Sequence, residues 1–335
     1  MQQLLIYEPS ARRLSGWLAE RQDRLAPVIL GEDGTLDLDG QALKAEELRL
    51  DLAWANSDLF GSPAVRAFMI HCLKSSTLRF FQSSAAGFDH PVFGMLVDKG
   101  VRLASSNAAA PGIAEWVLAR VLEHFKGLPE RREHQQARRW QRVWSREVGG
   151  STWVVVGMGH IGGEVSVRAR ALGARVIGVR RTPRGDEPAD EMVTPAELPR
   201  VAAEADVVVL AAPSNADSQH LVDAALLGRV KPTAVLVNVG RGSLVDEAAL
   251  VAALDRGALE AALLDVFATE PLPEESPLWA HPKVRVSAHD SPLSDAFIAR
   301  GDALFTRNVD LILAGEEPEG VVSAEVVKAS VPGND

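Results

Sequence analysis

The chain of 335 residues contains a single cysteine, so no disulfide can form within it. Aromatic residues make up only 5% of the sequence, with one tyrosine among them. The opening residues, MQQLLIYEPSARR, lack an apolar run long enough for a signal peptide or a membrane anchor. These absences favour a cytoplasmic protein without a membrane partner.

Basic side chains are outnumbered by acidic ones. The 45 acidic side chains outnumber the 35 basic ones, and the formal charge of -10 opposes binding to nucleic acid unless a basic patch is segregated from the rest. The arginine-rich segment 130–148 is the candidate patch, but glutamates and two tryptophans, Trp140 and Trp144, interrupt it. This charge pattern favours a solvated or subunit-contacting helix over a nucleic-acid surface.

The length of the chain and its 47% apolar content predict two globular domains. Helix-like stretches such as 246–257 lie between several short apolar segments. Apolar strands that alternate with helices imply a parallel sheet covered on both faces. We therefore expect one doubly wound domain over residues 103–289. Its predicted strands are 151–156, 174–179, 206–212, 234–240, 259–267 and 284–288.

Residues 1–102 carry a shorter alternation that predicts a second, smaller α/β domain. Segment 110–127 is the expected outgoing helix, and the amphipathic segment 294–315 should return, so that residues 290–335 complete the first domain. The last residues, 325–335, are expected to be a frayed tail. The predicted fold class is therefore α/β, with two Rossmann-like doubly wound parallel-sheet domains and a cleft between them.

A glycine motif follows the valine-rich segment 151–156. Gly157, Gly159 and Gly162 form G-x-G-x-x-G, which permits a tight turn, a close approach to a pyrophosphate and close packing of helix on strand. A preceding strand and a following helix are the setting that dinucleotide binding requires, although a turn without a ligand remains the alternative. Other residues of this turn and of later strand ends are expected at the cofactor site: His160, Ile161, Ala212, Pro213, Val239 and Gly240.

The next predicted strand ends in arginine. Arg180 stands where an NAD-preferring site would have an acid, with Arg181 and Thr182 beside it. Guanidinium groups pair well with the 2′-phosphate of NADP. We therefore predict that NADP(H) is preferred and NAD(H) possible, against the alternative that these arginines form a solvated turn.

Three polar residues follow three different predicted strands: Arg241, Glu270 and His289. The carboxyl ends of parallel strands share one edge of a sheet, so these residues can meet there. An arginine can hold a carboxylate, a histidine can give up a proton near neutral pH, and a glutamate beside it favours the charged imidazole. Together they suit the reduction of a 2-oxo acid.

These segments resemble a known family. NVGRGSLVDEAAL around Arg241, LLDVFATEPLPEESPLW around Glu270 and VRVSAH before His289 are similar to the signatures of D-isomer-specific 2-hydroxyacid dehydrogenases. GMGHIG and the early SSAAGFDH extend the resemblance over about the whole chain. Within the family it is greatest to the NADPH-dependent glyoxylate/hydroxypyruvate reductase branch.

The resemblance implies a site and a mechanism. Arg241 would bind the substrate carboxylate and carbonyl, His289 would protonate the carbonyl oxygen, and Glu270 would orient His289, giving a D-2-hydroxy acid. Asp265 would contact the nicotinamide amide. The remaining substrate contacts would come from Ala86, Gly87, Trp54 and Trp279, although core packing is an alternative for either tryptophan. The family also implies a homodimer, for which segment 130–148 is the candidate arm, and no metal.

Two rival functions follow from the same scaffold. Some relatives of the family act as corepressors, so a nucleotide-sensing binding protein is the alternative class. Formate dehydrogenases have glutamine at the position of Glu270, which disfavours that activity. After His289 the sequence continues DSPLSD, where the family commonly has small or apolar residues and a glycine, so this wall of the substrate pocket is expected to differ.

Overall fold

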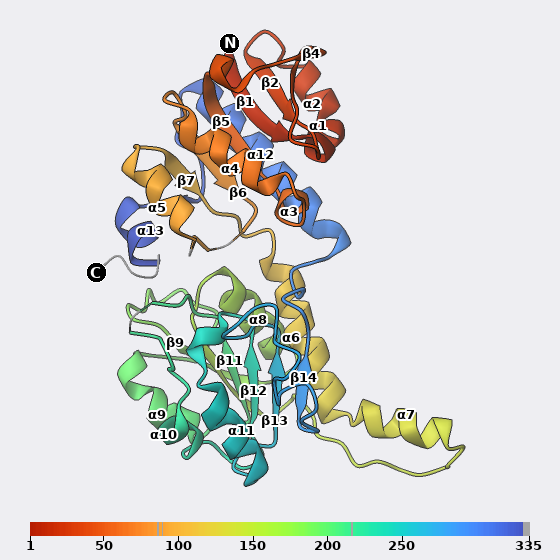
Figure 1. Ribbon diagram of the computed structural model, residues 1–335. Coiled ribbons are helices and arrows are strands. Elements are labelled where there is room, and N and C mark those ends of the chain that lie inside the picture. The colour runs from red at the N-terminus through yellow and green to blue at the C-terminus, as the bar shows by residue number, and fades with distance from the viewer. Residues whose placement is uncertain (86, 89, 216, 331–335) are drawn as a thin grey trace. The chain divides into compact units, whose positions relative to one another are not determined.

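The computed structural model describes residues 1–85, 87–88, 90–215 and 217–330. The chain forms two compact units, each with its own sheet and core: unit 1 is Met1–Ala109 with Ser294–Asp335, and unit 2 is Ala110–Leu293 (Figure 1). The units divide at 109/110 and 293/294. The sequence analysis placed the domain boundaries earlier in the chain, at 102/103 and 289/290. Within the described residues, no helix has both the length and the apolar composition needed to cross a bilayer.

A parallel sheet of seven strands forms the centre of unit 2, in the order β10-β9-β8-β11-β12-β13-β14. The order reverses between β8 and β11, the kind of switch point at which ligands bind beyond the carboxyl ends of the strands. The strands are β8 (Thr152–Val156), β9 (Arg175–Val179), β10 (Glu191–Val193), β11 (Val207–Leu210), β12 (Val235–Asn238), β13 (Ala261–Leu264) and β14 (Val284–Val286). All six predicted strands are present. The short edge strand β10 was missed, because three residues are too few for a periodic pattern.

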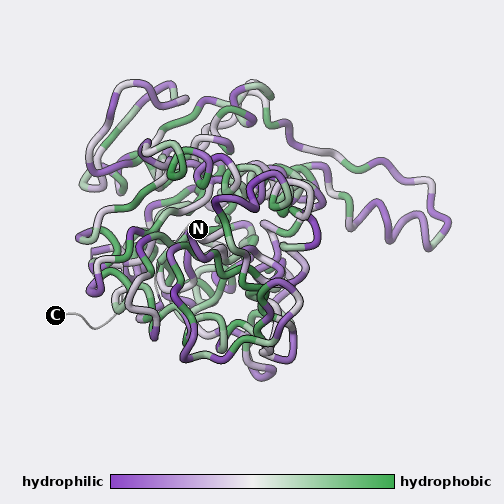
Figure 2. Tube along the Cα trace, turned by 90° about the horizontal axis from the view of Figure 1, so that it is seen from above, coloured by the Kyte–Doolittle hydropathy of each residue, from purple (hydrophilic) through white to green (hydrophobic). Residues whose placement is uncertain are grey.

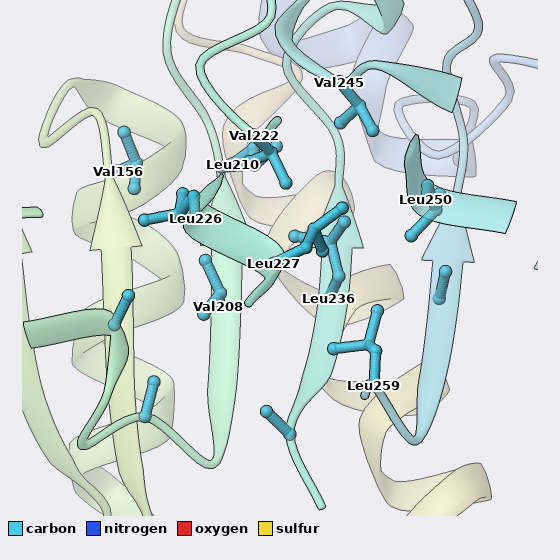
Figure 3. Packing of buried hydrophobic residues seen from close by; sticks show 14 of the residues in the cluster. Val156, Val208, Leu210, Val222, Leu226, Leu227, Leu236, Val245, Leu250 and Leu259 are labelled. Atoms are coloured by element: carbon cyan, nitrogen blue, oxygen red, sulfur yellow. The ribbon is translucent and has the colours of Figure 1, made fainter. Parts of the chain in front are cut away.

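Helices cover both faces of this sheet, as the alternating sequence predicted. On one face lie α6 (Ala110–Phe125) and α8 (His160–Ala171), which pack against each other (Figure 1). On the other lie α9 (Leu198–Ala202), α10 (Ala224–Leu227) and α11 (Glu247–Asp255). Figure 3 shows Leu226 and Leu227 of α10 and Leu250 of α11 packed over the valines and leucines of the strands. Because the strands are buried on both faces, their carboxyl ends are held firmly.

One segment of unit 2 projects away from its sheet. Helix α7 (Leu128–Gln136) begins it, and an irregular stretch leads back toward β8 (Figure 1). We call residues 128–147 the arm. It is mostly hydrophilic (Figure 2), yet Trp140 and Trp144 are 102% and 98% exposed. Because α7 ends at Gln136, the helix predicted over 130–148 is present only in its first part.

The sheet of unit 1 has the order β15-β7-β6-β5-β1-β2-β3-β4. Its parallel part, β7-β6-β5-β1-β2, has the strand order of flavodoxin-like folds, and β3, β4 and β15 are antiparallel additions. The strands are β1 (Gln2–Tyr7), β2 (Leu25–Leu30), β3 (Leu36–Leu38), β4 (Gln41–Ala42), β5 (Leu50–Ala55), β6 (Phe80–Ser83), β7 (Arg102–Ala104) and β15 (Val321–Val322). Both units thus carry a mainly parallel sheet, as the fold class required.

Helices also flank the sheet of unit 1 on both faces. They are α1 (Glu8–Arg13), α2 (Ser15–Ala19), α3 (Ser57–Phe60), α4 (Val65–Lys74), α5 (Pro91–Asp98), α12 (Asp295–Ala314) and α13 (Ala324–Ser330). The returning helix α12 buries Phe305 and Val309 against β1 and β5. Cys72 of α4 is fully buried on the opposite face, and burial raises the pKa of its thiol.

The frayed tail predicted for residues 325–335 is wrong over its first part. Residues 324–330 form α13, which packs on α5 and buries Val327 completely. One buried valine in a short polar segment gives too weak a periodic signal to be recognised in the sequence. Residues 331–335 lie outside the described part of the chain.

Candidate active site

The glycine turn between β8 and α8 is shaped by close contacts. Gly157 has φ +95°, and a Cβ atom there would lie 2.6 Å from the backbone nitrogen of Ala212. A Cβ on Gly162 would lie 2.0 Å from the carbonyl oxygen of Gly157. At Gly159, by contrast, an added Cβ would meet nothing within 4 Å. Two of the glycines are thus required by packing, whereas the second faces open space, as the approach of a pyrophosphate requires.

A cavity of about 650 Å³ lies beside this turn. Its apolar lining can accommodate an adenine ring, and its polar lining includes two arginines. It is lined by Val156, Gly157, Met158, Gly159, Val179, Arg180, Arg181, Thr182, Pro195, Leu198, Ala212, Pro213, Asn215, Asp217, Ser218 and Leu221. The glycine turn, the arginines and this volume together fit a dinucleotide.

Seven of the residues predicted for cofactor binding line this cavity: Gly157, Gly159, Arg180, Arg181, Thr182, Ala212 and Pro213. The others are not among its described lining residues: His160, Ile161, Gly162, Val239, Gly240 and Asp265. Gly240 is closely packed, because a Cβ there would lie 2.7 Å from the carbonyl oxygen of Ala212. Its contact with the cofactor stays a prediction. In the loop after β11 the sequence analysis predicted Ala212 and Pro213 but missed Asn215 and Ser218, although their place after a strand end was a usable signal.

The three neighbouring strands β12, β13 and β14 bring the chemically important residues to one edge. Arg241 follows β12, Asp265 follows β13 directly, and His289 follows β14. The Arg241 loop is fixed by Asn238, whose side chain donates to the carbonyl of Arg241 at 2.9 Å and accepts from the N–H of Gly240 at 3.1 Å. The half-buried Arg241 donates from Nη1 to its neighbour's carbonyl, that of Gly240, at 2.7 Å.

Gly242 joins the Arg241 loop to the segment that carries Glu270. A Cβ at Gly242 would lie 1.8 Å from the carbonyl carbon of Phe267, so the two backbones are in direct contact there. The N–H of Phe267 in turn donates to Oε1 of Glu270 at 2.9 Å. The loops of Arg241 and Glu270 are therefore packed as one structure.

His289 and Glu270 form a hydrogen-bonded pair. Nδ1 of His289 lies 2.8 Å from Oε2 of Glu270, and the two side chains are 47% and 36% exposed. With Nδ1 directed at the carboxylate, Nε2 lies on the far side of the ring. Such a carboxylate fixes both the tautomer and the orientation of an imidazole, which suits it to proton transfer through Nε2.

The buried carboxylate of Asp265 holds the turn that carries His289. Its side chain accepts from the hydroxyl of Ser287 at 2.5 Å, from the N–H of Asp290 at 3.0 Å and from the N–H of Ser291 at 3.2 Å. Its own carbonyl accepts from the N–H of His289 at 2.8 Å. His289 has φ +54°, a left-handed conformation that needs such support. The first residues of the DSPLSD segment are thus tied to the site through their backbone.

The residues predicted to bind the substrate carboxylate and side chain are placed differently. Ala86 lies outside the described residues, and Gly87 is half-buried in the loop after β6. Trp54 is fully buried, stacks on Phe305 at a ring distance of 4.8 Å and donates to Asp302 at 3.1 Å. The substrate contact predicted for Trp54 is therefore corrected to core packing, since its ring and its N–H are both used inside unit 1.

Trp279 lies in unit 2 and is 52% exposed. Its indole N–H donates to the carbonyl of Pro273 at 2.9 Å, which leaves part of the ring surface open. Its role toward a substrate stays a prediction. Within the described residues, no group of three or more histidine, cysteine or acidic side chains could hold a metal ion.

The chain is similar to known proteins over most of its length. It is 32% identical to glyoxylate/hydroxypyruvate reductase B of Pectobacterium atrosepticum, covering 75% of this chain and 81% of that one. A D-isomer specific 2-hydroxyacid dehydrogenase family protein from Aeromonas salmonicida has a similar structure, with a TM-score of 0.78, 28% identity and coverage of 96% and 99%. A D-isomer specific 2-hydroxyacid dehydrogenase from Xanthobacter autotrophicus Py2, solved with NADPH and MES, gives a TM-score of 0.76, 26% identity and coverage of 97% and 99%.

The family model described as "D-isomer specific 2-hydroxyacid dehydrogenase, NAD binding domain" matches residues 118–291. This range contains the glycine turn, the arginine-lined cavity and the pair of His289 and Glu270. The chain therefore belongs to the family of D-isomer specific 2-hydroxyacid dehydrogenases, and unit 2 carries its NAD-binding domain.

Proposed function

We propose that the protein reduces a small 2-oxo acid to the D-2-hydroxy acid, with NADPH as the preferred cofactor. The observation that carries the proposal is the pair of His289 and Glu270, held at 2.8 Å on the sheet edge where Arg241 also emerges. A hydrogen-bonded histidine beside an arginine suits a substrate that has a carboxylate next to a carbonyl. The similarity to a glyoxylate/hydroxypyruvate reductase supports substrates of that size.

The chain's own residues would bind the substrate and supply a proton. The guanidinium of Arg241 would hold the carboxylate and the adjacent carbonyl oxygen, and so orient C2. Protonated His289, fixed through Nδ1 by Glu270, would donate its Nε2 proton to that oxygen as general acid. The bound cofactor supplies the hydride that C2 accepts, so that one hydride and one proton convert the carbonyl to an alcohol. The predicted contact of Asp265 with the nicotinamide amide belongs to the same proposal.

The preference for NADPH is supported by the cavity beside the glycine turn. Arg180, Arg181 and Thr182 all line it, directly after β9, where an acidic residue would select NADH. Two guanidinium groups and a hydroxyl can pair with a 2′-phosphate. The neighbouring structure from Xanthobacter autotrophicus was solved with NADPH, which is consistent with this preference.

The experiment that tests the function is oxidation of NADPH and of NADH by the purified protein. The substrates are glyoxylate, hydroxypyruvate, pyruvate and phenylpyruvate, and Arg241→Ala is the control. We expect turnover that is faster with NADPH and is lost in the variant. Tight NADPH binding without turnover of any acid would instead indicate a nucleotide-sensing protein.

We further propose that the protein is a homodimer formed through the arm. Exposure of two tryptophans on a mainly charged projection is costly unless another surface covers them. Sedimentation of the wild type should give a dimeric mass, and Trp140→Ser with Trp144→Ser should weaken it. A monomeric mass for the wild type at micromolar concentration would refute the dimer.

A cytoplasmic location completes the proposal. The only cysteine is a buried thiol, which is compatible with a reducing compartment. Fractionation of cells that express the tagged protein should recover it with the cytoplasmic fraction.

A further inference from the structure

The loop between β9 and β10 is wrapped around one carboxylate, that of Glu187. Its Oε1 accepts from the N–H of Arg184 at 2.8 Å, and its Oε2 accepts from the N–H of Gly185 at 2.9 Å. The side chain is only 4% exposed, although residues 181–186 around it are all exposed. A solvent-facing loop is thus held from within by a buried anion.

The same carboxylate binds one end of Arg180. Nη1 of Arg180 donates to Oε1 of Glu187 at 3.2 Å and to the carbonyl of Met158, inside the glycine turn, at 3.3 Å. Among the described residues, Nε and Nη2 of Arg180 find no acceptor. These two nitrogens form an edge of the guanidinium that can grip two oxygens at once. Because Arg180 also lines the cavity, one of its edges is anchored and the other is available to a ligand there.

A carboxylate close to a phosphate could also repel it. Here the charge of Glu187 is already met by two backbone N–H groups and one guanidinium. The N–H of Arg184, then that of Gly185 and the charge of Arg180, hold the pKa of Glu187 below its ordinary value, so it stays ionised. An ionised anchor keeps these contacts at neutral pH. By holding Arg180 and the loop in place, Glu187 should therefore strengthen phosphate binding more than its charge weakens it.

We propose that Glu187 is a positioning residue for cofactor selection, fixing Arg180 and the loop 180–187 so that the free edge of the guanidinium meets the 2′-phosphate. This inference rests on the proposed preference for NADPH and adds to it the residue that sets the preference. The position of Arg180, and not only its charge, then determines the discrimination between the two cofactors.

The test is calorimetric binding of two probes to the full chain: adenosine 2′,5′-bisphosphate and adenosine 5′-monophosphate. In Glu187→Gln the amide oxygen can still accept one N–H, but the NH₂ group cannot accept the other. We expect the Kd of the bisphosphate to rise about tenfold, the scale of one charge-assisted hydrogen bond. The Kd of the monophosphate should change by less than about twofold, because that probe has no 2′-phosphate.

Two further variants separate position from charge. Glu187→Asp keeps the charge but withdraws the oxygens from the N–H groups, so it should show the same selective loss. Asp186→Asn removes a charge from the neighbouring, exposed position and should leave the ratio of the two Kd values unchanged. Equal effects of Asp186→Asn and Glu187→Gln, or tighter binding of the bisphosphate to Glu187→Gln, would overturn the inference.

The wild-type result separates this inference from the proposed function. If the wild type binds the two probes equally, the preference for NADPH fails and the inference fails with it. If the wild type favours the bisphosphate and Glu187→Gln keeps that ratio, only the role of Glu187 is refuted.

Discussion

Two turns at the carboxyl edge of the unit 2 sheet are each built around one buried carboxylate. Asp265 holds the turn that carries His289, and Glu187 holds the loop that carries Arg180. The bonds of Asp265 join residues 22 to 26 positions apart, whereas those of Glu187 join residues two to seven apart. The first turn therefore depends on the pairing of β13 with β14, and the second is a local structure. Substitutions of Asp265 should therefore lower both the stability of the protein and its kcat. Substitutions of Glu187 should weaken only the binding of the ligand.

The largest effect is expected from a variant that removes the proton donor and keeps the turn held by Asp265. His289→Gln should lower kcat by about 10³-fold, the usual contribution of a positioned general acid. Binding of NADPH should not change, since His289 lies outside the cavity beside the glycine turn. Steady-state kinetics and calorimetry measure the two quantities. His220→Gln is a matched control, because His220 is also exposed and has φ +49°. A fall in kcat of similar size in both variants would contradict the assignment of the acid.

Asp265→Asn should break the turn itself. The amide cannot accept all the hydrogen bonds that the carboxylate accepts, so a buried donor loses its partner. We expect kcat to fall by about 30-fold as His289 loses its orientation, together with a lower apparent Tm. Ser287→Ala, which removes one of these bonds, should show a smaller fall of both. Weaker NADPH binding at unchanged Tm would instead favour the predicted nicotinamide contact of Asp265 as its main role.

Arg180→Ala makes the matching change in the second turn. It should raise the KM for NADPH about tenfold through loss of a charge-assisted pair, and leave the KM for NADH within about twofold. The apparent Tm should hold, because the loop is exposed and local. Steady-state kinetics measure the KM values, and thermal melting checks that the apparent Tm falls in Asp265→Asn but not in Arg180→Ala. Unchanged KM values for both cofactors would show that Arg180 lies in a solvated turn, and equal rises in both KM values would contradict its role in selecting NADPH.

The smallest effect is expected at the amino end of β13, the strand whose carboxyl end leads into Asp265. Glu260 accepts from His124 at 2.8 Å and from Arg146 at 3.0 Å. The hydrogen bond from His124, aided by the charge of Arg146, lowers the pKa of Glu260 from its ordinary value of 4.5. Because the pKa of Glu260 is lower in the folded state, its ionised carboxylate stabilises the folded protein at pH values above 4.5. This stabilisation is lost as the pH falls through the pKa of the folded state.

Glu260→Gln should therefore lower the apparent Tm slightly at pH 7, and the difference from the wild type should shrink in acid. Melting curves across this pH range measure it, and activity serves as the control, since Glu260 lies at the edge of the sheet opposite the site. A difference in Tm that grows on acidification would contradict the stated direction of the pKa shift.

Much of this architecture could be predicted because strong local patterns coincide with it. The valine-rich strands, the glycine motif and the long helices α6 and α12 each contain enough periodic residues to be recognised. The short elements β10 and α13 do not. Trp54 shows another limit, because its partner in the core, Phe305, is distant in sequence and belongs to the returning helix.

The supporting residues of the site were harder to find than the residues they support. Arg241, Glu270 and His289 stand at strand ends, a position that the order of elements predicts. The bonds of Asp265 to Ser287, Asp290 and Ser291 depend on which strands pair, which no local pattern gives. Glu187 could not be predicted because its partners are backbone N–H groups of its own loop and Arg180, and no sequence pattern marks such contacts.

The buried thiol of Cys72 gives unit 1 a built-in reporter. It lies in the core between β-strands and α4 with no exposed surface, and unit 2 contains no cysteine. A thiol reagent can modify the native protein only when the core of unit 1 opens, so the rate of labelling measures that opening alone. The opening of unit 1 can therefore be timed without adding any label site to the sequence, while unit 2 stays unlabelled.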